Sequence, residues 1–331
     1  FSIFCLLASF GIGNMSQVNS IAINMTSAFK IPATVVGIVL AVLAALVIVG
    51  GLKRIASVTE KLVPFMAIIY IIGALAIFIM NIGQCGAVFS AILKGAFGLR
   101  AVGGGIVGSG VKLAITWGMK RGVFSNEAGL GSSVMVHSNS NVKEPVRQGM
   151  WGIFEVFADT IVVCTLTAFA VLSSGLVDLE TGAVLSASEG SALVGEAFST
   201  VFGSAGPAFI ALAILLFAFS TVLGWSHYGS KAWEYLFNTK STIIYKIVFI
   251  IMIYEGAVMK PNLAWDLSDT FNGLMAIPNL IGVLSLSPIV VKITKNYVAR
   301  NIKKEDVKPI LSVFPDIEEA QIKEMEETNK N

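Results

Sequence analysis

Amide side chains stand inside an apolar stretch near the start of this sequence. Residues 11–20 read Gly-Ile-Gly-Asn-Met-Ser-Gln-Val-Asn-Ser, and the three-residue spacing of Asn14 and Gln17 predicts that both lie on one face of a helix. A buried amide without a partner is costly in an apolar medium, so we expect both to point toward a neighbouring helix or a small polar ligand. Hydrogen bonding between helices is the structural alternative, and the pattern alone does not separate the two.

Two hydroxyls and an indole form a second group of candidate binding side chains further along the chain. Ser220 and Thr221 offer oxygen atoms, the ligand type that a hard cation such as sodium requires, and Trp225 stands one helical turn beyond Thr221. The indole would wall a small apolar pocket. The structural alternatives are hydroxyls bonded to carbonyls of their own helix and a tryptophan anchored at the membrane interface.

Glycine is concentrated between residues 101 and 131, on both sides of Trp117. So many glycines weaken a continuous helix, and a broken helix exposes backbone amides and carbonyls that can hold a carboxylate or a cation. Close packing of small residues between helices is the alternative interpretation.

Titratable groups give little support for an enzyme. Glu155 and Asp159 are four residues apart, and His137 and His227 stand in separate segments, so neither a nucleophile with its base nor a metal site is evident. We expect Asp159 to form an ion pair with Lys112; a proton or sodium relay is the functional alternative.

The elements that must position these groups are membrane helices. Of the 331 residues, 55% are hydrophobic and 13% are charged, and the mean hydropathy is +0.79. The charged fraction is about half the roughly 25% of soluble domains, so the sequence predicts an all-α integral membrane protein in a lipid bilayer. A net charge of +2 gives no reason to expect a nucleic-acid partner.

We expect eight spans, at residues 1–27, 33–51, 62–82, 104–119, 149–174, 204–226, 242–259 and 271–292.

Lysine and arginine favour alternate loops. They are enriched after the second, fourth, sixth and eighth runs, at Lys53, Arg54, Lys61, Lys120, Arg121, Lys143, Arg147, Lys231, Lys240, Lys295, Arg300, Lys303 and Lys304. The positive-inside rule then places the first run's start and the C-terminus in the cytoplasm, as in a multi-pass plasma-membrane protein. We expect a transmembrane domain at residues 1–300 and a charged cytoplasmic tail at residues 301–331.

Long motifs resemble one transporter family. Arg121-Gly-Val-Phe-Ser-Asn-Glu-Ala-Gly-Leu-Gly-Ser132 resembles the signature of the alanine or glycine:cation symporter family (sodium:alanine symporters). The likeness extends through the amide-rich stretch near Asn14 and residues 145–165, 220–228 and 265–279, so it covers nearly all of residues 1–300. It implies a leucine-transporter-like fold with two inverted repeats of five helices. The eight spans would be helices 3–10, the glycine-rich helix would be the broken sixth, and the chain would be N-terminally truncated.

The resemblance also implies a function and its residues. It implies sodium-coupled symport of a small neutral amino acid, alanine or glycine, by alternating access, with sodium as the co-transported ion. Asn126 and Glu127 would lie near the cytoplasmic end of the broken helix and serve gating or folding. The implied substrate-binding residues are Gln17, Asn14, Trp117, Gly118 and Trp225, and the implied sodium ligands are Thr221 and Ser220.

Two other functions remain in view. One is a truncated fragment that does not transport, and the other, which the titratable groups favour less, is a membrane-embedded enzyme. The oligomeric state is left open, with a monomer among the options.

Overall fold

The regular structure of this chain is helical. The computed structural model describes residues 1–97 and 107–329, and within these ranges there is no strand beyond a single isolated bridge, so the predicted all-α class is confirmed. In chain order the elements are α1 (Ser2–Phe10), η1 (Gly11–Met15), α2 (Ser16–Phe29), α3 (Ala33–Ile48), α4 (Gly51–Met80), η2 (Ile82–Gln84), α5 (Cys85–Ala96), α6 (Val107–Asn126), α7 (Val134–His137), α8 (Pro145–Val156), η3 (Phe157–Cys164), α9 (Thr165–Leu172), α10 (Gly190–Phe202), α11 (Ala205–Leu236), α12 (Thr242–Val258), α13 (Pro261–Asn301) and α14 (Pro315–Asn329).

Long apolar helices identify a membrane protein. In the described part of the chain, four helical stretches are long and apolar enough to cross a bilayer: Gly51–Met80, Pro145–Leu172, Ala205–Leu236 and Pro261–Asn301. Many of their large apolar side chains face outward, as lipid-facing residues do. The remaining expected spans correspond to shorter or interrupted helices, so the count of eight stays a prediction.

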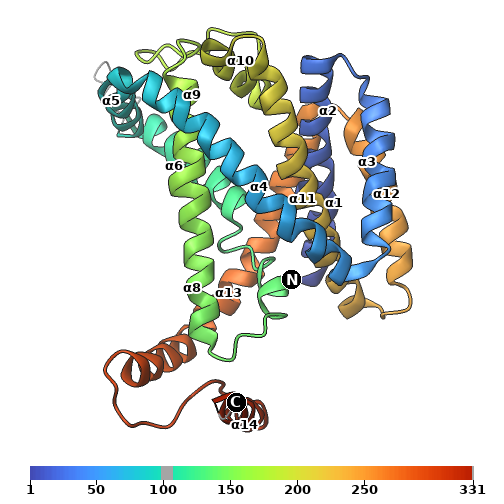
Figure 1. Cartoon of the computed structure of the whole chain (residues 1–331), viewed down its shortest axis with the longest axis vertical. Coiled ribbons are helices and arrows are strands. Elements are labelled where there is room, and N and C mark those ends of the chain that lie inside the picture. The colour runs from blue at the N-terminus through green and yellow to red at the C-terminus, as the bar shows by residue number, and fades with distance from the viewer. Residues whose placement is uncertain (98–106, 330–331) are drawn as a thin grey trace.

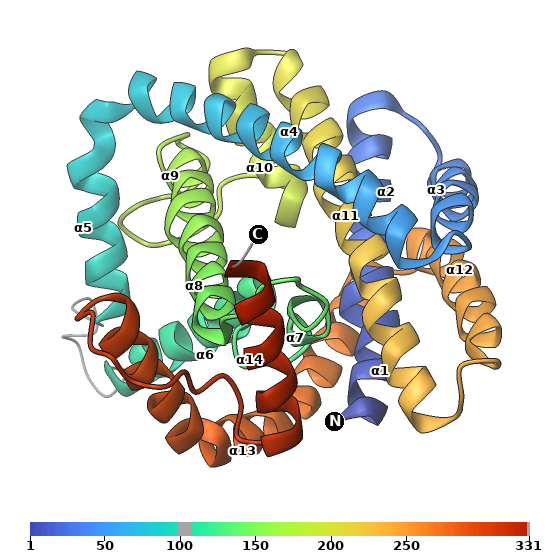
Figure 2. The ribbon, with the colours of Figure 1, turned by 60° about the horizontal axis from the view of Figure 1, so that its bottom comes forward.

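Helix α11 runs through the middle of the bundle. It lies along α1 and α2, while α3 and α12 pack together on one side and α5, α6 and α8 lie on the other (Figure 2). Helix α4 crosses the bundle obliquely between these two sides (Figure 1). Helix α11 crosses α1 and α12 closely at Gly229. A Cβ on this residue would lie 2.0 Å from Tyr245 Oη and 2.4 Å from Ser9 Oγ, so glycine is needed there.

The fourth expected span differs from the prediction in its boundaries. Helix α6 continues to Asn126, so Lys120 and Arg121, which we expected in a loop, lie within the helix. Val123 and Phe124 extend it because their side chains pack onto the cluster around Trp225. The first part of the glycine-rich run, up to residue 106, lies outside the described residues.

Candidate functional site

A π-helical turn interrupts the first long helix at the amide-rich stretch. Residues Gly11–Met15 form η1 between α1 and α2. Asn14 is fully buried and its Nδ2 donates to the carbonyl of Phe249 on α12 at 2.8 Å, whereas Gln17 Nε2 donates back to the carbonyl of Ile12 at 3.1 Å. A π turn changes the angular spacing of the side chains that follow it, so the two amides donate in different directions.

The second polar atom of the Asn14 side chain, Oδ1, finds no partner in the part of the chain that the structure describes. This oxygen is also buried. A buried acceptor left in this state costs about 1–3 kcal/mol, so a donor that reached it, such as the ammonium group of a ligand, would be bound favourably.

Trp225 on α11 packs directly against η1. Its side chain is 2% exposed, and a Cβ on Gly13 would lie 2.3 Å from Trp225 Cβ and 2.4 Å from Cγ. Only a residue without a side chain allows the indole to lie this close. Because Trp225 is buried inside the bundle, it does not serve as an anchor at the membrane interface.

Helix α6 is interrupted at residues 127–133, after which the short α7 begins. We call these seven residues the break. Backbone φ is positive at Glu127 (56°), Gly129 (87°) and Gly131 (81°), a region that glycine adopts without strain. Gly129 and Gly131 therefore mark the interruption.

Polar contacts tie the break, together with the last residue of α6, to three neighbouring elements. Glu127 accepts a hydrogen bond from Ser132 Oγ at 2.7 Å and another from the side chain of Trp225. Asn126 Nδ2 donates to Thr160 Oγ1 on η3 at 2.9 Å. On α13, Asn279 Nδ2 donates to the carbonyl of Gly129 at 2.9 Å.

Sequence reasoning placed Asn126 and Glu127 near one end of the broken helix, and α6 does end at Asn126. It did not anticipate that Glu127 accepts a hydrogen bond from Trp225. It did not single out Asn279, although that residue closes one of the motifs shared with the transporter family.

The two hydroxyls of α11 both donate to the carbonyl of Phe217, at 2.8 Å from Ser220 Oγ and 3.1 Å from Thr221 Oγ1. This is the structural alternative considered above, but a hydroxyl that donates its proton keeps lone pairs for a cation. Phe217 also lines an apolar cavity of about 710 Å³ between α4, η3 and α11, but neither hydroxyl residue lines it.

Trp117 and Gly118 have different surroundings. Trp117 is 50% exposed and lies beneath the Lys120 and Arg121 side chains, 5.2 and 5.4 Å from its ring centroid. A Cβ on Gly118 would meet nothing within 4 Å. Their assignment to a substrate site stays a prediction.

An ion-pair cluster joins α6 to α13 beside Trp117. Asp269 Oδ2 lies 2.7 Å from Arg121 Nη2 and 3.1 Å from Lys120 Nζ, and the Arg121 guanidinium stacks 4.7 Å from the Trp265 ring. We expect Asp269→Asn to lower the free energy of unfolding by about 1 kcal/mol, because the pair is partly exposed. Thermal melting in detergent measures this, with Asp269→Glu as the variant that keeps the charge. Equal melting of Asp269→Asn and the unmodified chain would show that the cluster contributes nothing.

Of the two acids of the fifth span, Asp159 has another partner than expected. Asp159 Oδ2 accepts from Ser125 Oγ on α6 at 2.6 Å, so α6 and η3 are joined by a hydroxyl rather than by the predicted pair with Lys112. Glu155 lies 3.2 Å from His137 Nε2 on α7. No cluster of three potential metal-ligating side chains occurs within residues 1–97 and 107–329.

Comparison with known proteins identifies the family. The model of the sodium:alanine symporter family matches residues 1–311. Similar relatives include the sodium/alanine symporter AgcS of Methanococcus maripaludis (43% identical, covering 93% of this chain and 66% of the relative) and the amino-acid carrier protein AlsT of Bacillus subtilis (37%, 96% and 67%). The probable sodium/glutamine symporter GlnT of Bacillus subtilis is 38% identical, with coverages of 87% and 59%.

The chain thus spans about two thirds of the length of the relatives it matches. Neither the family match nor these coverages confirm the expectation that the first core helices are missing. The long apolar helices and the family match agree on a multi-pass membrane protein from a family of transporters. The chain belongs to the sodium:alanine symporter family.

Proposed function

We propose that this chain takes part in sodium-coupled symport of a small neutral amino acid, alanine or glycine, by alternating access. One observation carries the proposal: two interruptions of regular helix, η1 and the break, meet at Trp225. Gly13 of η1 packs on the indole, Glu127 of the break accepts its hydrogen bond, and Leu130 shares its buried cluster. Interrupted helices that meet inside a bundle supply polar backbone groups where a zwitterion can bind.

Each part of the amino acid has a proposed partner. The ammonium group binds Asn14 Oδ1, which lacks a partner among the described residues, with Gln17 one turn away. The carboxylate binds backbone amides exposed at an interrupted helix. Trp225 walls the pocket and excludes larger side chains. Trp117 and Gly118 are kept as further candidates on the family resemblance alone.

Sodium is the proposed coupling ion. Ser220 and Thr221 supply hydroxyl oxygens one turn from Trp225, on the same helix, so an ion bound there would order the wall of the amino-acid pocket. By linkage, sodium tightens amino-acid binding and the amino acid tightens sodium binding by the same factor, typically about 1–3 kcal/mol. The names of relatives that mention sodium and alanine support this choice.

Three structural expectations are part of the proposal. These are the leucine-transporter-like arrangement of helices 3–10, the division into residues 1–300 and 301–331, and the cytoplasmic C-terminus. Packing of α11 along α1 and α2, and of α3 against α12, is compatible with such an arrangement.

We expect Thr221→Ala to raise the sodium concentration for half-maximal alanine uptake by about tenfold, or about 1.4 kcal/mol, because a cation ligand is lost. Uptake of radiolabelled alanine into proteoliposomes with an imposed sodium gradient measures it. Thr270→Ala is the matched control, because that hydroxyl also bonds a carbonyl four residues earlier but is exposed.

Three outcomes are informative. Uptake that ignores the sodium gradient would defeat the coupling proposal, and an unchanged sodium requirement in Thr221→Ala would remove this residue from the ion site. A well-folded chain that neither binds nor takes up alanine would favour the non-transporting fragment.

A further inference from the structure

A buried ion pair joins the end of α13 to the start of α8. Arg300 Nη1 lies 2.7 Å from Glu144 Oε1, and Nη2 lies 3.0 Å from Oε2, so the guanidinium binds the carboxylate with both nitrogens. The side chains are only 14% and 11% exposed. Such two-point, charge-assisted contacts are strong and fix geometry.

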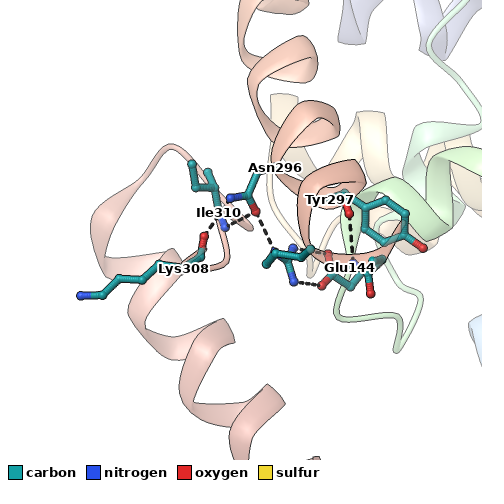
Figure 3. A network of polar contacts seen from close by, with 7 residues as sticks. Glu144, Asn296, Tyr297, Lys308 and Ile310 are labelled. Atoms are coloured by element: carbon teal, nitrogen blue, oxygen red, sulfur yellow. Dashed lines mark hydrogen bonds and ion pairs between the residues drawn. The ribbon is translucent and has the colours of Figure 1, made fainter. Parts of the chain in front are cut away.

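The same arginine is held by Asn296, which also binds the chain that follows α13. Asn296 Oδ1 accepts from Arg300 Nε at 2.8 Å and from the backbone N–H of Ile310 at 2.9 Å, while Nδ2 donates to the carbonyl of Lys308 at 2.8 Å (Figure 3). The Asn296 side chain thus binds the backbone of an extended segment through both its oxygen and its nitrogen. We call residues 302–311 the strap; its last residue, Leu311, is 2% exposed.

Glu144 is connected to the break through α7 and the beginning of α8. His137 at the end of α7 lies 2.6 Å from Gln148 Nε2 and 3.2 Å from Glu155, both on α8, so α7 and the beginning of α8 are bound together. Glu144 immediately precedes α8. If α7 shifts relative to α13, Glu144 must leave Arg300.

We infer that Glu144, Arg300, Asn296 and the strap form a latch that closes this end of the bundle and opens when the break moves. Separation of Glu144 leaves the Arg300 guanidinium without its carboxylate, in a largely buried place. Arg300 must then reorient toward water, and because its Nε shares Asn296 Oδ1 with the strap, Asn296 loses the contact that fixes it. The strap is released as a consequence. This inference rests on the proposed function, since alternating access is what requires the break to move.

A thiol reporter tests the latch without relying on transport. Leu311→Cys, in a chain whose Cys5, Cys85 and Cys164 are replaced by serine, is labelled with a water-soluble maleimide in proteoliposomes. We expect labelling to be slow in this background and about tenfold faster when Glu144→Gln is added. Arg300→Lys, which keeps the charge but not the two-point contact, should lie between them.

The strap offers a matched control. Lys303 and Glu305 form an exposed ion pair at 3.8 Å, so Glu305→Gln removes a carboxylate from the strap without removing a contact of Glu144, Arg300 or Asn296 and should not change labelling. A second measurement uses the unmodified cysteines and Leu311: chymotrypsin cleavage after the buried Leu311, followed by mass spectrometry, should accelerate in Glu144→Gln. Asn296→Asp, which loses the donor to Lys308, should accelerate it as well.

The outcomes separate the latch from the transporter. Labelling and cleavage that do not change in a folded Glu144→Gln variant would overturn the latch. If the chain takes up alanine but sodium and alanine together leave the labelling rate unchanged, its connection to the access change is wrong. Faster labelling in Glu144→Gln in a chain that shows no sodium-dependent uptake would support the latch and count against the proposed function.

Discussion

Replacing Gly13 with alanine is expected to abolish sodium-dependent alanine uptake and to lower the melting temperature of the protein in detergent. The new methyl group would lie 2.3 Å from Trp225 Cβ and 2.6 Å from Cδ2, well inside van der Waals contact. These atoms lie near the root of the indole rather than at a flexible tip, so either η1 or α11 must move. Overpacking of this kind costs about 1–3 kcal/mol and would displace the proposed pocket wall.

Gly282→Ala is the appropriate control for this prediction. It lies inside α13, and a Cβ there would meet nothing within 4 Å, so uptake and melting should remain as in the unmodified chain. Wild-type uptake in Gly13→Ala would mean that the contact between η1 and Trp225 has no role in transport.

The helical fold could be predicted from the sequence because apolar runs of membrane length leave the backbone no other way to satisfy its hydrogen bonds. The glycine-rich run also predicted an interruption, but its position could not be located from the sequence. The interruption lies at residues 127–133, where a positive φ favours Gly129 and Gly131. The π turn at η1 could not be predicted from the sequence. It shifts the angular positions of the side chains that follow it, and the spacing rules for regular helices do not include such a shift.

Lys120 and Arg121 lie in helix α6 rather than in the expected loop. The orientation inferred from the loop charges stays a prediction. The charge of Lys120 and Arg121 is compensated by Asp269, which comes from α13, 148 residues away from Arg121 in sequence. A partner so distant cannot be inferred from local pattern, and the same holds for Asn279 and for the pairing of Glu144 with Arg300.

Those distant partners share one helix. Asp269, Asn279 and Arg300 follow one another along α13, and their partners Arg121, Gly129 and Glu144 follow one another along the interrupted α6 and the chain after it. At about 1.5 Å per residue, the outer two anchor points are roughly 45 Å apart when measured along the axis of α13. Helix α13 therefore contacts α6, the break and the start of α8 at three successive points. A rearrangement of the break has to separate these contacts in some order.

The second large effect is expected for Glu127→Ala. The carboxylate accepts hydrogen bonds from Ser132 and Trp225, and its removal leaves two donors inside the bundle without their acceptor. Each such loss costs about 1–3 kcal/mol. We expect alanine uptake to fall roughly tenfold to hundredfold, since 1.4 kcal/mol corresponds to a factor of ten. The maximal uptake rate and the half-saturating alanine concentration, measured in proteoliposomes, show whether turnover or binding is affected.

Glu127→Gln distinguishes the acceptor from the charge. The amide keeps one oxygen that can accept from Trp225 or Ser132, so uptake should recover most of what alanine substitution removes. If glutamine is as damaging as alanine, the negative charge itself is required, and the role of Glu127 as an acceptor that joins the break to Trp225 is wrong. If both variants transport normally, the break and α11 do not need this connection, and the convergence at Trp225 loses its functional meaning.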